Sequence, residues 1–198
     1  MLRLGVLVSG GGSNLQAIID GINNQNITNV SIATVVSSKH EVYALQRAKQ
    51  NNIDATVIPK KDLTEDAFDA AIAGHMQEFN VDLIVMAGFL SIVGADLLSL
   101  FPGRIINVHP SLIPAFCGRG FYGLKVHEAA LKRGVKLTGA TVHGVNEIPD
   151  GGPILAQKAV EVKLDDTAES LQKRVMEEAE WVILPQVING IANGKIIL

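Results

Sequence analysis

The first two thirds of the chain alternate short apolar runs with segments of helical periodicity. Continuous apolar runs bounded by turn residues are typical of strands that are buried on both faces. These runs predict strands over residues 3–8, 30–36, 55–58, 83–86 and 104–108. Apolar residues at helical spacing predict helices over residues 15–22, 42–50, 64–79 and 95–101. The alternation indicates a mostly parallel sheet with helices on both faces.

The last third has a different pattern. Glycine, proline and aromatic residues crowd residues 110–123 and predict an ordered loop or a mobile flap. The pattern then predicts a helix over residues 126–133 and two strands over 138–145 and 153–162. A long helix over 167–191, bent at Pro185, and a final strand over 195–198 follow. We therefore expect a single α/β domain over residues 1–198, with a Rossmann-like sheet and an antiparallel C-terminal portion.

Composition excludes several classes of protein. The 198 residues carry 17 Lys and Arg against 20 Asp and Glu, a formal net charge of −3, and 47% are hydrophobic, which argues against disorder. An acidic chain with 5% aromatic residues is a poor candidate for nucleic-acid binding. The apolar run between Asp82 and Asp96 is shorter than the roughly 20 residues that cross a bilayer. With one cysteine and no signal-peptide pattern, we expect a soluble, cytoplasmic protein.

A glycine-rich segment at residues 9–14 lies between a predicted strand and a predicted helix. Glycines let backbone N–H groups approach a ligand, and a helix N-terminus favours negative charge, so the segment suits a phosphate. It is a poor dinucleotide motif because Leu15 occupies the third glycine position and residues 37–39 hold no acidic side chain. A helix start with a capping box of Ser13 and Gln16 is the alternative interpretation.

Two polar residues, Asn107 and His109, stand at the end of a predicted central strand, where open α/β sheets place their ligands. Two positions apart on a strand, they should point to the same side. An amide donor and an imidazole suit the stabilisation of an oxyanion. The alternative is that His109 only ends the strand before Pro110.

The segment Pro149-Asp150-Gly151-Gly152-Pro153 is, taken alone, an ordinary turn. Asp150 gains a chemical role only if this turn folds over His109. A carboxylate there would raise the pKa of the histidine and hold a proton for transfer.

Four segments, taken in order, carry a family resemblance. They read Gly-Gly-Gly-Ser-Asn-Leu-Gln-Ala-Ile-Ile, Ala-Gly-Phe-Leu, Asn-Val-His-Pro-Ser-Leu-Ile-Pro and Asp-Gly-Gly-Pro, starting at Gly10, Ala87, Asn107 and Asp150. From residue 3 to about residue 197 the chain resembles the folate-dependent formyltransferases, and the Ser-Asn-Leu-Gln loop narrows this to their purine-pathway branch. The resemblance implies formyl transfer from 10-formyltetrahydrofolate, the co-substrate, to the amine of 5′-phosphoribosylglycinamide, without a metal.

The resemblance also implies roles for individual residues. The catalytic group is Asn107, His109 and Asp150. The residues that hold the substrate phosphate through backbone N–H groups are Gly12, Ser13 and Asn14, and those near the glycinamide and ribose are Pro110 and Glu180. The residues that contact the folate are Leu90, Ser91, Val93, Val145 and Glu147. The nucleotide-substrate half would lie at about residues 1–100, and the catalytic and folate half at about 101–198.

Some positions depart from the family pattern. Ser91 stands where many relatives have an arginine near the folate. Thr64-Glu65 replaces a basic position that can hold the folate glutamate tail, and Lys60 or Lys61 is a candidate substitute. These changes concern folate affinity and tail preference and leave the chemistry intact.

Three further side chains could carry a different chemistry, as a nucleophile or as metal ligands. Cys117 as a nucleophile beside His109 is disfavoured, because its glycine-rich surroundings give no helix N-terminus to activate a thiolate. His127 and His143 have no partner at metal-site spacing. We expect a surface or loop role for His127, and we expect His143 to pack beside the active site.

Three other functions share part of the pattern. A formyltetrahydrofolate hydrolase has the same catalytic group but normally an N-terminal regulatory domain, whereas the first predicted strand here begins at residue 3. A formyltransferase acting on methionyl-tRNA usually adds a C-terminal tRNA-binding domain and needs a basic surface, but this chain is acidic. A non-catalytic sensor of phosphorylated ligands would not need the three catalytic residues. We expect an enzyme acting on small molecules, as a monomer or homodimer, with no nucleic-acid or membrane partner.

Overall fold

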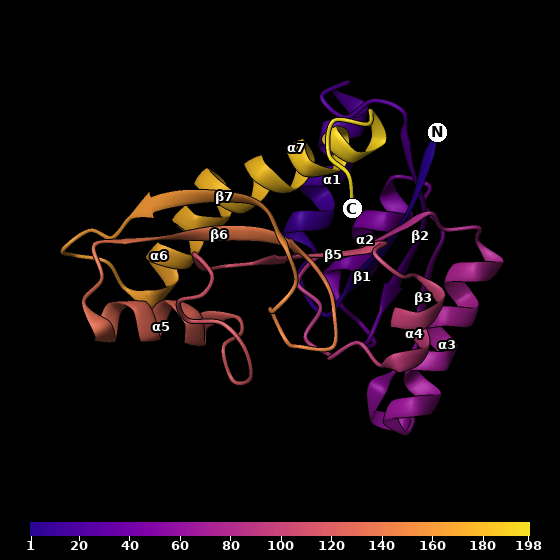
Figure 1. Ribbon diagram of the computed structural model, residues 1–198, viewed down its shortest axis with the longest axis horizontal. Coiled ribbons are helices and arrows are strands. Elements are labelled where there is room, and N and C mark those ends of the chain that lie inside the picture. Colours follow the sequence, from indigo (N-terminus) through magenta and orange to yellow (C-terminus); the bar gives the residue numbers. More distant parts are fainter.

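The computed structural model describes residues 1–198 and contains one seven-stranded sheet in the order β3-β2-β1-β4-β5-β6-β7 (Figure 1). The strands are β1 (Leu2–Val8), β2 (Val30–Ser37), β3 (Ala55–Val57), β4 (Leu83–Met86), β5 (Ile105–His109), β6 (Leu137–Gly144) and β7 (Ile154–Glu161). The first five pair in parallel, whereas β5 with β6 and β6 with β7 pair antiparallel. The predicted fold class is confirmed.

Helices cover both faces of the sheet, as predicted. They are α1 (Ser13–Asn23), α2 (Tyr43–Gln50), α3 (Glu65–Glu78), α4 (Ala95–Leu100), α5 (Leu124–Arg133), α6 (Ala168–Val175) and α7 (Trp181–Ala192), with a 3₁₀ turn at Lys60–Asp62 and a π turn at Met176–Glu180. Up to residue 162, every predicted strand and helix begins and ends within two residues of an observed one. No helix is long and apolar enough to cross a membrane.

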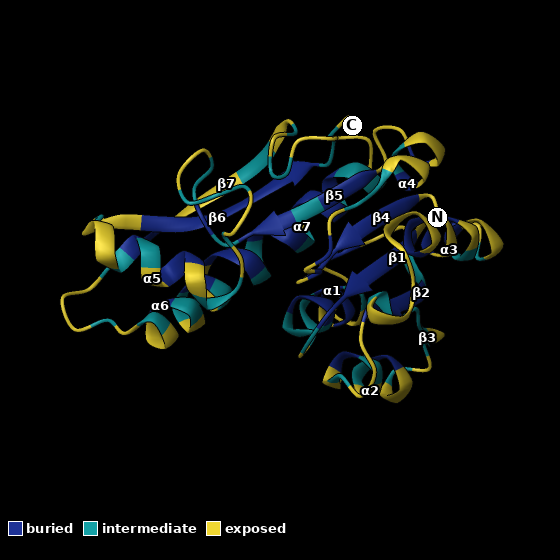
Figure 2. Ribbon diagram, turned by 90° about the horizontal axis from the view of Figure 1, so that it is seen from below, coloured by how far each residue is buried: buried dark blue, intermediate teal, exposed yellow.

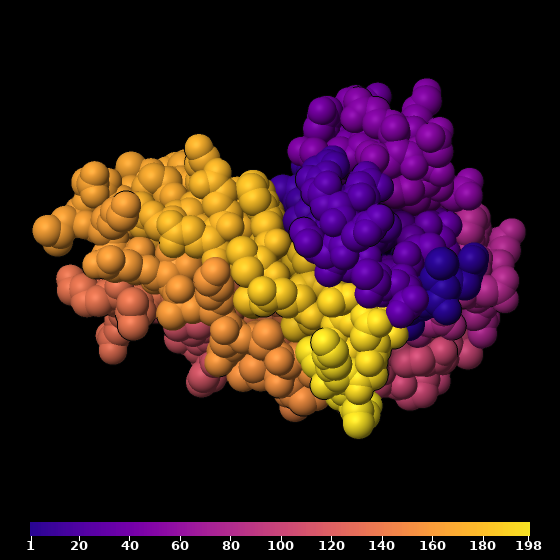
Figure 3. Space-filling view, turned by 90° about the horizontal axis from the view of Figure 1, so that it is seen from above, coloured from indigo at the N-terminus to yellow at the C-terminus, as the bar shows by residue number.

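Two apolar clusters sandwich the sheet. The larger one joins the sheet to residues of α1, α2, α5, α6 and α7, and the smaller one joins the other face to α3 and α4. In Figure 2 the central strands are buried and the outer helix surfaces are exposed. Helix α7 packs on α1, so the end of the chain contacts its beginning (Figure 3). The N- and C-terminal halves therefore share one folded body.

The long C-terminal helix predicted over residues 167–191 is present as one unbroken helical run over residues 168–192. What the pattern does not predict is a π turn at Met176–Glu180, which joins α6 to α7 within that run, and Pro185 lies inside α7. Buried apolar residues recur at every fourth position here, at Leu171, Val175, Ala179 and Ile183. A spacing of four drifts by about 40° per step around an α-helix. The wider π turn reduces this drift and keeps these side chains on the core side.

The strand predicted over residues 195–198 is absent, and that prediction is wrong. Gly194 has a φ of 68° and turns the chain back. The N–H groups of Lys195 and Ile196 then donate to the carbonyl of Gly190, at 2.8 and 3.1 Å. These bonds close the end of α7, so the apolar side chains that suggested a strand belong to a helix cap.

Candidate active site

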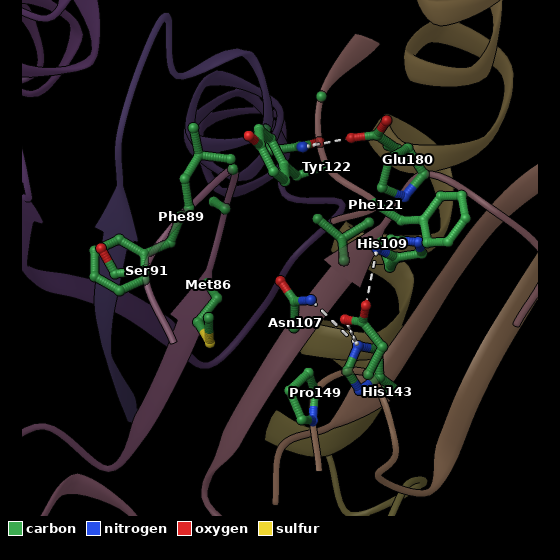
Figure 4. Close-up of a pocket in the computed structure, with 18 of the residues that line it drawn as sticks. Met86, Phe89, Ser91, Asn107, His109, Phe121, Tyr122, His143, Pro149 and Glu180 are labelled. Carbon is green, nitrogen blue, oxygen red and sulfur yellow. Dashed lines mark hydrogen bonds and ion pairs between the residues drawn. The ribbon is translucent and has the colours of Figure 1, made fainter. Parts of the chain in front are cut away.

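A cavity of about 630 Å³ opens at the carboxyl ends of β1, β4 and β5, which are neighbours in the sheet. Segments far apart in sequence line it: the glycine-rich loop, residues 86–93, the end of β5, the loop at 118–123, the turn before β7 and the π turn. Open α/β sheets bind ligands at this edge. The cavity is therefore the candidate active site (Figure 4).

The glycine-rich loop forms one end of the cavity. Gly12 is the N-cap of α1 and has a left-handed φ of 72°. A Cβ there would lie 2.7 Å from the Cβ of Ala44 on α2, so the close approach of these two elements requires glycine. Arg47, also on α2, donates to the carbonyl of Gly11 at 2.9 Å and helps to hold the loop.

The capping-box alternative for this loop is wrong. Ser13 is the first helical residue, and no side chain caps α1. The Ser13 hydroxyl contacts the sulfur of Met176 at 3.7 Å instead of a backbone N–H group. Because no side-chain cap occupies them, the first N–H groups of α1 are available to an anionic ligand.

Asn107 and His109 point into the centre of the cavity from β5, as predicted (Figure 4). The turn at 149–153 does fold over His109, and Oδ2 of Asp150 lies 3.5 Å from Nδ1 of His109. On the other side of the ring, Nε2 of His109 donates to the carbonyl of Phe116 at 2.9 Å. The three residues of the expected catalytic group therefore meet in one place.

His143 joins this group from β6, directly opposite Asn107 in the antiparallel pair. Its Nδ1 donates to the Gly144 carbonyl at 2.7 Å, and its Nε2 lies 3.2 Å from the amide nitrogen of Asn107. The same Nε2 lies 3.5 Å from Oδ1 of Asp150. The expectation that His143 packs beside the site is confirmed, and its contacts orient both Asn107 and Asp150.

Charge in this group is concentrated on Asp150. Burial raises the pKa of Asp150, but His143, His109 and the N–H group of Gly118 outweigh burial and hold that pKa below its ordinary value. Burial lowers the pKa of His109, and the Asp150 carboxylate offsets only part of this effect. The ligand-free site at neutral pH therefore contains a carboxylate facing a neutral imidazole, which can take up a proton at Nδ1.

The backbone around His109 is strained. Phe116 and Asp150, its two partners, have left-handed φ values of 51° and 56°. A Cβ on Gly152 would overlap the carbonyl oxygen of Gly144, so the turn that carries Asp150 needs a glycine there. Such conformations cost free energy and concentrate at functional sites. The strain fixes both partners of His109 in place.

A second polar pair links the π turn to the glycine-rich loop. The Asn14 amide donates to the Glu180 carboxyl at 2.6 Å, and both side chains are buried in the cavity wall. Burial raises the pKa of Glu180 to about 7, although the Asn14 hydrogen bond lowers it. Two residues expected at the substrate thus contact each other across 166 positions of sequence.

Most residues expected at the folate line the cavity, namely Leu90, Ser91, Val93 and Val145, as does Pro110 on the substrate side. Glu147 is exposed and is not among the lining residues. Lys60 lies 3.8 Å from Glu65 and, like Lys61, lines no part of the cavity. That either lysine holds the folate glutamate tail in place of the basic residue missing at Thr64-Glu65 stays a prediction.

Sequence reasoning missed part of the cavity wall. The expectation of a surface or loop role for His127 is wrong, because the residue lies inside α5, is fully buried and lines the cavity. Arg119, Phe121 and Tyr122 line it from the loop that glycine and aromatic residues predict over residues 110–123, to which the sequence gives no role. For Cys117, burial and the Asp150 charge raise the pKa of the thiol, which agrees with its rejection as a nucleophile.

Known proteins resemble this chain over its whole length. The family model described as formyl transferase matches residues 2–188. The chain is 38% identical over 196 residues to the chloroplastic phosphoribosylglycinamide formyltransferase of Arabidopsis thaliana, covering 98% of this chain and 66% of that protein. It is 38% identical over 199 residues to the phosphoribosylglycinamide formyltransferase of Haemophilus influenzae, covering 100% of this chain and 91% of that one.

Solved structures agree with these sequence comparisons. The crystal structure of glycinamide ribonucleotide transformylase 1 from Symbiobacterium toebii superposes with a TM-score of 0.93 at 42% identity, covering 100% of this chain and 91% of that one. The chain spans just under two thirds of the length of the plant relatives, at 66% and 62%. The likeness therefore extends to the whole of the fold described above.

Proposed function

The chain belongs to the formyl transferase family, and we propose that it transfers a formyl group from 10-formyltetrahydrofolate to the amine of 5′-phosphoribosylglycinamide in purine biosynthesis. One observation carries the proposal. A single cavity joins an uncapped helix N-terminus suited to phosphate to the group of Asn107, His109 and Asp150. A phosphorylated amine bound at the first feature would present its amine to the second.

The substrate half of the cavity suits a phosphorylated sugar. We assign the phosphate to the backbone N–H groups of Gly12, Ser13 and Asn14, where the α1 dipole favours negative charge. Glu180, buried beside Asn14, would accept from the ribose hydroxyls. Pro110, at the end of β5, would bound the glycinamide.

The chemistry needs no covalent enzyme intermediate. The amine nitrogen attacks the formyl carbon, a new C–N bond forms, and the carbonyl oxygen becomes an oxyanion. His109 would take up the proton that the attacking amine loses, and the charged ring together with the Asn107 amide would stabilise the oxyanion until that proton is passed on. The bond from the formyl carbon to the folate nitrogen then breaks, and the proton lost by the amine ends on that nitrogen. Asp150 would stabilise the charged His109 and assist this proton transfer.

The folate would occupy the other side of the cavity. Leu90, Val93 and Val145 offer apolar contact to a pterin, and Ser91 offers a hydroxyl group. Glu147 would contact the folate only from the exposed side of its turn. The assignment of residues 1–100 to the nucleotide substrate and 101–198 to catalysis and folate, the cytoplasmic location and the monomer or homodimer remain predictions.

A hydrolase of 10-formyltetrahydrofolate is the alternative that uses the same group. The phosphate-binding end of the cavity favours the transferase, because water as acceptor needs no such site. The experiment is to follow loss of formyl-folate with and without phosphoribosylglycinamide. Turnover that requires the amine supports the proposal, equal turnover without it supports the hydrolase, and no turnover in either mixture contradicts both.

A further inference from the structure

One buried side chain in the cavity wall has no hydrogen-bond partner in the protein. His127 lies in the second turn of α5, is 0% exposed and lines the cavity. Neither Nδ1 nor Nε2 makes a hydrogen bond. Buried polar groups are nearly always paired, because an unpaired one lowers the free energy of unfolding. His127 is therefore a costly choice for α5 unless something else bonds to it.

The other buried histidines of the cavity differ in this respect. Both ring nitrogens of His109 face a partner, Phe116 on one side and Asp150 on the other. In His143, Nδ1 bonds to Gly144 and Nε2 to Asn107. Of the three, only His127 has two ring nitrogens without a hydrogen-bond partner in the protein.

The protonation state of His127 defines what it can bind. Burial and the nearby His109 lower its pKa to about 4. At neutral pH the ring is uncharged and offers one N–H donor and one nitrogen acceptor. A phosphate or a carboxylate, which only accepts, would pair with one of the two ring nitrogens and leave the other unpaired. The neutral ring suits an uncharged group that both donates and accepts, such as an amide, amine or hydroxyl.

We propose that His127 is a substrate-binding residue that hydrogen-bonds an uncharged amide, amine or hydroxyl group of a substrate in the cavity. The inference rests on the proposed function, because its test uses that reaction. His127 and His109 line the same cavity, which puts the bonded group in the space that holds the reacting atoms. Both proposed substrates carry groups of this kind, so the two Michaelis constants distinguish which one His127 contacts.

The test compares His127→Leu, His127→Phe and His127→Gln with the wild type. If the ring nitrogens are unpaired in the free protein, an apolar side chain should keep or raise Tm. The same apolar variants should raise KM for one of the two substrates by about tenfold, the scale of one lost hydrogen bond. Glutamine, which keeps a donor and an acceptor, should recover part of this loss.

A matched control separates binding from packing. Thr138 on β6 is also buried with an unpaired hydroxyl but lines no part of the cavity. Thr138→Val should therefore keep or raise Tm, as His127→Leu does, and leave both KM values unchanged. If the wild type shows no transfer at all, the proposed function fails and the His127 proposal with it.

The proposal on its own is overturned by three results, given an active wild type. The first is unchanged KM values in both apolar variants, which would show that no substrate group bonds to the ring. The second is a clear fall in Tm with unchanged KM values, which would show a structural role. The third is failure of both apolar variants to fold, which would show that the ring is bonded within the protein.

Discussion

Oδ2 of Asp150 lies 3.5 Å from Nδ1 of His109. The other ring nitrogen, Nε2, donates a hydrogen bond to the Phe116 carbonyl. The carboxylate thus faces the one ring nitrogen that can gain a proton. Its own pKa is held low while burial lowers that of His109. The pair can accept a proton when negative charge develops on a bound substrate.

Asp150→Asn keeps the shape of the turn and removes the charge. Loss of general acid–base assistance should lower kcat by roughly 100-fold or more. Binding of phosphoribosylglycinamide, measured by calorimetry, should change little, because the phosphate end of the cavity is untouched. Asp165→Asn, the same change at an exposed site, is the control and should keep wild-type kcat. Weaker binding of phosphoribosylglycinamide with an unchanged kcat would show that Asp150 acts in binding.

Glu180 makes stability depend on pH. Its pKa is about 7 in the folded protein and about 4.3 in an unfolded chain. The protonated form therefore stabilises the fold below about pH 4.3, and this contribution is lost as pH rises through 7. The glutamine of Glu180→Gln is never charged. The Tm of this variant minus the Tm of the wild type should therefore increase as pH goes from 5 to 8. Thermal unfolding at both values measures this, and a constant difference would contradict it.

Gly12→Ala should damage the phosphate end of the cavity. The new Cβ meets Ala44 at 2.7 Å and sits at a left-handed φ, so the loop must move. We expect a loss of about 1–3 kcal/mol in the free energy of unfolding and weaker binding of phosphoribosylglycinamide. Gly74→Ala, inside α3 with open space around the new Cβ, should gain up to about 1 kcal/mol. Denaturant unfolding distinguishes the two, and equal losses would refute the steric account.

Asp166 and Arg174 fix the connection between β7 and α6. The guanidinium donates to both carboxylate oxygens, at 2.6 and 2.7 Å, and also to the Glu161 carbonyl. Asp166→Asn should cost about 1.5–3 kcal/mol, as expected for a charged hydrogen-bonded pair with little solvent exposure. Glu177→Gln, which breaks the exposed contact with Lys173, should cost less than about 1 kcal/mol.

The pair of Asp166 and Arg174 should make the connection between β7 and α6 sensitive to acid. Hydrogen bonding from Arg174 holds the pKa of Asp166 well below its ordinary value. A lowered carboxyl pKa contributes stability above about pH 4, and that contribution is lost as pH falls further. The Tm difference between wild type and Asp166→Asn should therefore shrink below pH 4. A difference that grows on acidification would contradict this account.

The spacing of apolar residues along the chain predicts the architecture, because most helices and strands bury one face and carry apolar side chains on it. Phe68, Ile72 and Met76 mark the inner face of α3, and all three are buried. Asn107 and His109 could be assigned to one side of a strand because side chains there alternate. The π turn could not be predicted in this way, since its cause is the packing of Leu171 to Ile183 against the sheet.

The site residues that sequence reasoning missed depend on tertiary contacts. His127 was expected at a surface because nothing along the chain shows that α5 turns it inward. Glu147, which we predict at the folate, lies on the exposed side of the turn that brings Asp150 into the cavity, and its contact with folate stays a prediction. Asp150 itself looked like a common turn residue, and only the folding of its loop over His109 gives it a chemical setting.

The most direct test of the central claim follows the formyl carbon itself in a single turnover. Enzyme in excess is mixed with 10-formyltetrahydrofolate labelled at that carbon and with phosphoribosylglycinamide, and the products are separated over time. Direct attack by the amine predicts that label enters the formylated glycinamide at the rate at which formyl-folate is lost, with no lag and no free formate. Label appearing as formate, or on the protein before the amine, would contradict the account.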